Sequence, residues 1–172
     1  MLFRSPVTTD VPAAPRPGKL TPRPTEPVIV DAAFVQAHAT APGYKVIDAR
    51  NTIFFDGPVK PASGTYANGR PREPIVPGHV PGAVNIVFET MFDDTNHLLP
   101  EAKLRELFSA AGVKPNDTLI AYCHIGQQAT AVLFAARSLG HPVLLYDGSY
   151  QDWSRRADNP VEDPRAGKVK AQ

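Results

Sequence analysis

The alternation of short apolar runs with segments of helical spacing constrains the fold of this chain more than any other feature. The apolar runs have the length of buried strands and span residues 44–48, 83–86, 118–122 and 143–146. Apolar residues at intervals of three and four indicate helices at residues 30–40, 100–112 and 129–140 and near Trp153. Strands that alternate with helices predict an α/β fold whose sheet is parallel and covered on both faces.

Length and charge narrow the classes of protein further. The 172 residues, of which 42% are hydrophobic, suit one domain with one core. A formal net charge of +1 without a basic run argues against nucleic acid or an anionic membrane surface as a partner. The apolar runs are much shorter than the roughly 18 to 20 residues of a membrane span, and the first residues lack a secretory hydrophobic region. We therefore expect a cytoplasmic protein.

Proline and glycine mark the boundaries of the domain. Seven prolines within residues 1–27 exclude a helix or central strand there and predict an extended linker or strap. Residues 28–159 are expected to form the domain, and the polar residues 160–172 a C-terminal tail. Many glycines and prolines between residues 51 and 78 predict a long loop.

The single cysteine, Cys123, is the first candidate for chemistry. One cysteine excludes an internal disulfide and argues against a cysteine-based metal site. We expect no metal and no cofactor. Cys123 follows a predicted strand and precedes a predicted helix, and α/β sheets bind ligands at that junction. Backbone N–H groups of the connecting loop and the helix N-terminus would favour the thiolate. Position alone leaves two readings open, a reactive thiol and an inert buried one.

Four motifs in the same order resemble those of the rhodanese family of sulfurtransferases. They are the loop Cys123-His-Ile-Gly126-Gln-Gln-Ala129, the strand end Val46-Ile-Asp-Ala-Arg50, the segment 78–86 and the segment 146–153. The resemblance covers about residues 28–159 and is greatest to the catalytic C-terminal half of tandem rhodaneses, with residues 6–12 similar to the linker between the halves. It implies a rhodanese-like fold with a central, mostly parallel five-stranded sheet and helices on both faces.

The resemblance also implies an activity, that of a thiosulfate sulfurtransferase (rhodanese)-type transferase. Cys123 would take a sulfane sulfur from a small donor such as thiosulfate, hold it as a persulfide and pass it to a thiol or to cyanide. Arg50 would contact the anionic donor, unless it forms only an ordinary surface salt bridge. Substrate binding would further involve the loop residues His124, Ile125, Gly126, Gln127 and Gln128. We expect the His124 side chain to face solvent, and Asp48 and His79 to have structural roles.

A partner surface is also expected. In tandem rhodaneses the N-terminal half helps to wall the active-site cleft, and this chain resembles only the other half. A second copy or a partner protein would then cover the cleft. A monomeric mass in light scattering at working concentration would contradict the homodimer.

Several features of the loop leave the substrate and the class of activity open. Ile125 stands where the mercaptopyruvate-type loop has serine, and the basic residues common in thiosulfate-type loops are absent. A cysteine phosphatase would need arginine six residues after the cysteine, where this chain has Ala129. The alternative to an enzyme is a non-turnover sulfur-relay or regulatory binding module with the same fold. Turnover with thiosulfate and cyanide would separate the two.

Overall fold

The computed structural model describes residue 21 and residues 27–57, 76–164 and 168–170. Most of the predicted linker 1–27 and most of the predicted loop 51–78 therefore lie outside the described residues. Within the described part of the chain, no helix is long and apolar enough to cross a membrane.

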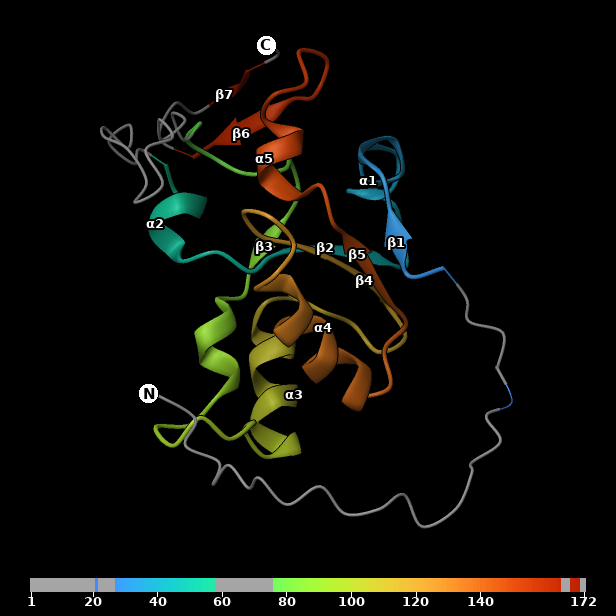
Figure 1. Ribbon diagram of the computed structural model, residues 1–172, viewed down its shortest axis with the longest axis vertical. Helices are drawn as coiled ribbons and strands as arrows, with labels where there is room; N and C mark the ends of the chain where they lie inside the picture. Colours follow the sequence, from blue (N-terminus) through green and yellow to red (C-terminus); the bar gives the residue numbers. More distant parts are fainter. Residues whose placement is uncertain (1–20, 22–26, 58–75, 165–167, 171–172) are drawn as a thin grey trace, which may run out of the picture.

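A five-stranded parallel sheet forms the centre of the domain (Figure 1). Its order is β1 (Ile29–Val30), β5 (Val143–Tyr146), β4 (Thr118–Tyr122), β2 (Tyr44–Asp48) and β3 (Val84–Asn85). β2 and β4 pair along their whole length, from Tyr44 opposite Thr118 to Asp48 opposite Tyr122. The chain therefore leaves both strands at the same edge of the sheet, which brings Arg50 and Cys123 to one place. The predicted five-stranded sheet is confirmed.

Helices cover both faces of this sheet, as predicted. In β4, Leu119 and Ala121 point into one core and Ile120 and Tyr122 into the other, following the two-residue period of a strand. The first core lies against α3 (Glu101–Ala110), α4 (Ala129–Ser138) and the short 3₁₀ helix η1 (Phe88–Met91). The second lies against α1 (Ala32–His38) and α5 (Ser149–Trp153). In the view of Figure 1, α3 and α4 lie below the sheet and α1 and α5 above it.

The predicted helical region 30–40 contains a strand residue as well as the helix. Val30 lies in β1, where Ile29 and Val30 pair with Leu145 and Tyr146. The helix starts only after Asp31, whose side chain accepts a hydrogen bond of 2.8 Å from the Phe34 N–H. An aspartate at this position satisfies a backbone donor that the helix itself leaves free. The two residues before the cap thus supply the fifth strand.

Residues beyond the predicted domain end also pack onto it. β6 (Val161–Asp163) pairs with β7 (Lys168–Lys170), and Glu162 exchanges two backbone hydrogen bonds of 2.9 Å with His79. Val161 is buried in the second core, and the Trp153 indole N–H donates to the Pro160 carbonyl at 2.8 Å. The segment expected to be a polar tail therefore begins as an ordered strand. The three residues of β6 include a single apolar one, Val161, which gives no periodicity from which to predict the strand.

Removal of the helix cap should destabilise the domain without changing its core. We expect Asp31→Ala to lower the free energy of unfolding by about 1 kcal/mol, because the Phe34 N–H loses its acceptor. Asp31→Asn keeps an acceptor oxygen at this position and serves as the control. Urea denaturation of both variants measures the effect, and equal stabilities would contradict the capping role.

Candidate active site

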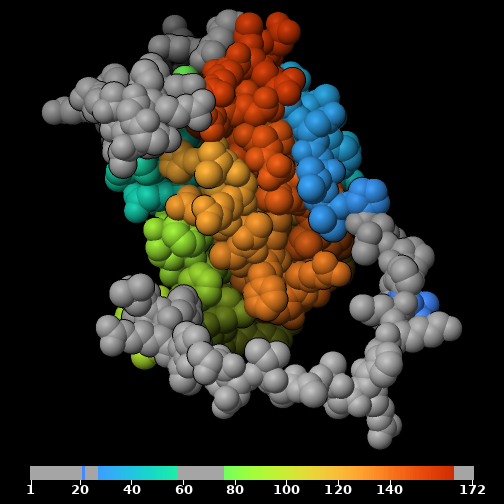
Figure 2. Space-filling view, viewed as in Figure 1, coloured from blue at the N-terminus to red at the C-terminus, as the bar shows by residue number. Residues whose placement is uncertain are grey.

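Cys123 lies directly after β4, at the edge of the sheet where β2 also ends. Its side chain is buried, with 1% of the residue exposed. The loop 124–128 separates it from α4, which begins at Ala129. In Figure 2 this part of the chain, in golden orange, reaches the surface between α2 (Thr52–Phe55), in teal, and the red-orange α5. The structure thus places the cysteine at the strand-to-helix junction that the sequence predicts.

The start of α5 holds the backbone of Cys123 on both sides. The Cys123 N–H donates to the Ser149 hydroxyl at 3.1 Å, and the Cys123 carbonyl accepts from the Tyr150 N–H at 3.0 Å. The Ser149 hydroxyl in turn donates to the Tyr146 carbonyl at 3.0 Å. The next carbonyl, that of His124, accepts from the Gln151 N–H at 3.2 Å. These bonds fix the position from which the loop begins.

The loop itself offers backbone donors that the protein does not use. Among the described residues, the backbone N–H groups of residues 124–128 have no protein acceptor. Such a series of free amides at a strand-to-helix junction forms an anion-binding concavity. The arrangement can therefore bind a thiolate or an anion next to the sulfur of Cys123.

Gly126 makes the curvature of this loop possible. Its φ of +88° lies in the left-handed region. A Cβ atom at this position would lie 2.7 Å from the Asp147 carboxylate oxygen Oδ1 and 3.1 Å from the Asp147 carbonyl oxygen. Both the backbone conformation and the close approach of Asp147 therefore require glycine at position 126.

Arg50 forms a buried ion pair with Asp48. Its Nε donates to both carboxylate oxygens at 2.9 and 3.0 Å, and its Nη2 donates to the Gly78 carbonyl at 2.8 Å. The guanidinium carbon lies 3.8 Å from the centre of the Tyr150 ring. Burial alone would lower the pKa of Arg50, but the hydrogen bonds and charge of Asp48 raise it above its usual value.

The contacts of Arg50 differ from those of a surface salt bridge, because both partners are fully buried. Only Nη1 lacks a partner among the described residues, and this atom is buried too. Asp48 also accepts the Arg50 backbone N–H at 2.9 Å, in keeping with its predicted structural role. Donor contact by Arg50 stays a prediction.

His124 does not face solvent as expected. Its ring is half-buried and meets the Phe54 ring edge to face, with 4.5 Å between ring centres and 90° between planes. Burial lowers the pKa of His124 below its usual value, and the positive charge of Arg50 lowers it further. The imidazole is therefore neutral at neutral pH and adds no positive charge beside Cys123.

The other predicted loop residues divide between surface and interior. Ile125 and Gln127 are exposed, whereas Gln128 is half-buried and its Oε1 atom has no partner among the described residues.

His79 is buried, with its ring stacked 3.7 Å from the Phe55 ring and its Nδ1 2.9 Å from the Phe55 carbonyl. These contacts match the structural role predicted for His79.

Sequence reasoning missed three residues of the site. Ser149 accepts a hydrogen bond from the Cys123 N–H and has a φ of +56°. Tyr150 stacks on Arg50, and Phe54 contacts His124. The motif 146–153 was the available signal for the first two. Nothing in the sequence pattern indicated Phe54, because it lies in a segment without helical periodicity.

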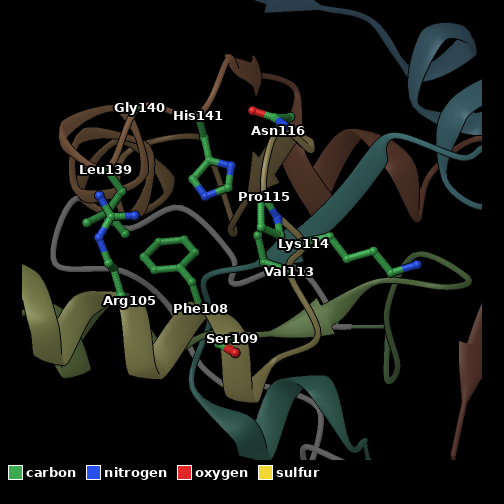
Figure 3. A pocket seen from close by; sticks show the side chains of 10 residues that line it. All are labelled: Arg105, Phe108, Ser109, Val113, Lys114, Pro115, Asn116, Leu139, Gly140 and His141. Carbon is green, nitrogen blue, oxygen red and sulfur yellow. The ribbon is translucent and has the colours of Figure 1, made fainter.

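A pocket of about 360 Å³ lies at the other end of the sheet (Figure 3). Residues 113–116, which precede β4, and residues 139–141, which precede β5, form much of its wall. Because both groups lie at the amino ends of their strands, this pocket is separate from the Cys123 loop.

Among the described residues, no cluster of His, Cys, Asp or Glu side chains could hold a metal ion.

The geometry defines a class of protein: an α/β domain that presents one cysteine inside a loop of free backbone amides at the carboxyl edge of a parallel sheet. Residues 31–156 match the family described as the rhodanese-like domain. The chain belongs to this family. The family and fold predicted from the sequence are thereby confirmed.

Curated relatives carry sulfurtransferase names. A probable 3-mercaptopyruvate sulfurtransferase of Pseudomonas aeruginosa is 34% identical over 148 residues, which are 85% of this chain and 48% of that protein. The mitochondrial thiosulfate/3-mercaptopyruvate sulfurtransferase 1 of Arabidopsis thaliana is 34% identical over 122 residues, 70% of this chain and 30% of that protein. The chain thus spans half or less of the length of these two relatives.

Solved structures share the fold. The anaerobic ergothioneine biosynthesis enzyme from Chlorobium limicola, in complex with trimethyl histidine, superposes with a TM-score of 0.66. The match covers 78% of this chain and 32% of that chain at 20% sequence identity. At this identity the likeness shows the fold alone.

The half-buried His124 ring predicts a dependence of stability on pH. Because the pKa of His124 is lower in the folded state, its contribution is fully present above the unfolded pKa of about 6.5 and is lost as pH falls through the folded pKa. We expect the wild type to lose more stability between pH 7.5 and pH 5 than His124→Gln. Urea denaturation at both pH values tests this, and parallel losses would contradict it.

Proposed function

We propose that the protein is a sulfurtransferase that carries a sulfane sulfur on Cys123 as a persulfide. The observation that supports this proposal best is the free backbone N–H groups of residues 124–128 around the cysteine. The sulfurtransferase names of its relatives support the same class of reaction. The chemistry needs a nucleophilic sulfur and a place for negative charge, and the site combines both.

The transfer takes place in two steps. In the first, the Cys123 thiolate attacks the outer sulfur of thiosulfate, the S–S bond of the donor breaks, and sulfite leaves with its electron pair. The loop amides donate to the terminal sulfur of the Cys123 persulfide, which carries the negative charge. In the second, a thiolate or cyanide attacks that terminal sulfur, and the bond to the Cys123 sulfur breaks. The thiolate is thereby regenerated, and the product is a new persulfide or thiocyanate.

The contacts of α5 position the nucleophile during both steps. Ser149 and Tyr150 bind the N–H and carbonyl of Cys123, so the cysteine backbone cannot turn away from the loop. The buried Asp48–Arg50 pair supports the same region through the stacking of Arg50 on Tyr150. We assign positioning roles to Ser149 and Tyr150.

The choice of donor follows from the charges at the site. Thiosulfate carries two negative charges, and the described residues next to Cys123 offer amides rather than free cations. Asp48 compensates the charge of Arg50, and His124 is neutral. Relatives carry both thiosulfate and mercaptopyruvate names. We propose thiosulfate as a donor with weak binding, and a thiol or cyanide as the acceptor.

The persulfide can be detected directly. After treatment with thiosulfate, we expect intact-mass spectrometry to show one added sulfur on the wild type and none on Cys123→Ser. Cys123 is the only cysteine of these 172 residues, so this variant removes every thiol. Cyanide should discharge the sulfur as thiocyanate over many cycles, which a non-turnover relay module would not do. The proposal fails if several donors, mercaptopyruvate included, never load the wild type.

Substitution of Gly126 tests the role of the loop amides. We expect Gly126→Ala to reduce sulfur transfer about 100-fold, because the added Cβ collides with Asp147 and displaces the amide donors. Gly140→Ala is the matched control: Gly140 has a φ of +93° but no atom within 4 Å of the added Cβ. That control should lose about 1 kcal/mol of stability and keep its activity. A near-normal rate for Gly126→Ala would contradict the amide role.

A further inference from the structure

The pocket at the amino ends of β4 and β5, of about 360 Å³, has a size that suits a small organic molecule (Figure 3). Apolar side chains of Phe108, Val113 and Leu139 line it, together with the cations Arg105 and Lys114. None of the described residues that line it is acidic. Apolar walls with a few polar or charged groups are typical of sites that bind small organic ligands.

Hydrogen bonds fix the two loops that form this pocket. The Asp117 carboxylate accepts from the Lys114 N–H at 2.9 Å, and the Asp117 carbonyl lies 3.1 Å from Nδ1 of His141. The His141 N–H donates to the Ala136 carbonyl of α4 at 3.2 Å. At Gly140 a Cβ atom would have no other atom within 4 Å, so the loop leaves open space there. The pocket is therefore already formed without a ligand.

Two rings give this pocket an aromatic wall. The ring centres of Phe108 and His141 are 6.4 Å apart, with 22° between their planes. Phe108 is 2% exposed and His141 is half-buried, so the His141 ring presents more surface to a ligand. A ligand with one aromatic ring removes apolar surface from water here and stacks as well, which an aliphatic ligand of the same size does not do.

The cations of the pocket have donors that the protein leaves unused. Arg105 donates to one carboxylate oxygen of Glu101, from Nε at 2.9 Å and from Nη2 at 2.7 Å. This pair is more than half exposed, so it contributes little to stability and can be shared with a ligand. Among the described residues, Nη1 of Arg105 and the Lys114 ammonium have no acceptor. Both groups only donate, so the acceptor that suits them is an anion.

We propose that this pocket binds a small aromatic acid. Its ring packs against His141 and Phe108, and its carboxylate accepts from Arg105, with Lys114 as a further cation on the other side of the rings (Figure 3). The site lies at the edge of the sheet opposite to Cys123. The inference is therefore independent of the proposed sulfur transfer and adds a second ligand site to the domain.

Benzoate is the probe, because it combines one ring with one carboxylate. We would titrate the full chain with benzoate at pH 7 and follow the backbone amide signals by NMR. We expect saturable shifts for residues 105–116 and 139–141, with a Kd of about 1 mM. Benzamide has the ring without the charge, and acetate has the charge without the ring. Each should bind at least about fivefold more weakly than benzoate.

Two exposed residues of opposite charge should change the affinity in opposite directions. Arg105→Gln removes the guanidinium and should weaken benzoate binding about fivefold. Glu101→Gln removes the competing carboxylate and should strengthen it about twofold, an effect that damage to the fold would not produce. Arg137→Gln is the matched control, since Arg137 is exposed in the last turn of α4 and does not line the pocket. It removes the same charge and should leave the Kd unchanged.

Three results would overturn the inference: benzamide binding as tightly as benzoate, shifts confined to the cysteine loop 123–128, or equal losses of affinity in Arg105→Gln and Arg137→Gln. Absence of saturation at 20-fold the expected Kd would overturn it as well. Failure of Cys123 to take up sulfur contradicts only the proposed function, so the two failures are distinguishable.

Discussion

The buried pair of Asp48 and Arg50 holds together the edge of the sheet on which the site depends. It joins the end of β2 to the Gly78 carbonyl and, through stacking, to Tyr150 at the start of α5. Loss of one partner of such a pair leaves a buried charge without compensation, at a cost of roughly 3 to 5 kcal/mol. Three segments that are distant in the sequence therefore meet around one guanidinium group, which stacks on the residue that binds the Cys123 carbonyl.

The free amides of the loop follow from this arrangement. The start of α5 donates its N–H groups to the carbonyls of Cys123 and His124, and Ser149 accepts the N–H of Cys123. The backbone N–H groups of residues 124–128 have no acceptor among the described residues. Gly126, with its positive φ, permits the backbone to turn there. The loop after the cysteine thus offers backbone dipoles, while Asp48 compensates the charge of Arg50 and the Asp147 carboxylate lies close to Gly126.

Much of the fold and the centre of the site could be predicted from the sequence, because they rest on local patterns. The strands 44–48 and 118–122 have the predicted bounds, and the position of Cys123 between strand and helix follows from them. Short strands without periodicity, such as β1 and β6, depend on partners distant in the sequence. The same reason explains the burial of Arg50 and the contact of His124 with Phe54. Each is a tertiary contact that no local spacing encodes.

Cys123 is the single cysteine of these 172 residues, and this affects how long the proposed persulfide would last. A persulfide next to a second thiol is lost by attack of that thiol, which forms a disulfide and releases hydrogen sulfide. Within these 172 residues Cys123 has no such neighbour, and only 1% of it is exposed. Under the proposed function, no other thiol within these 172 residues could displace a sulfur atom held by Cys123, and an outside nucleophile would have to reach it. The domain would therefore keep the persulfide sulfur until an acceptor arrives, and the arrival of the acceptor would set the time of transfer.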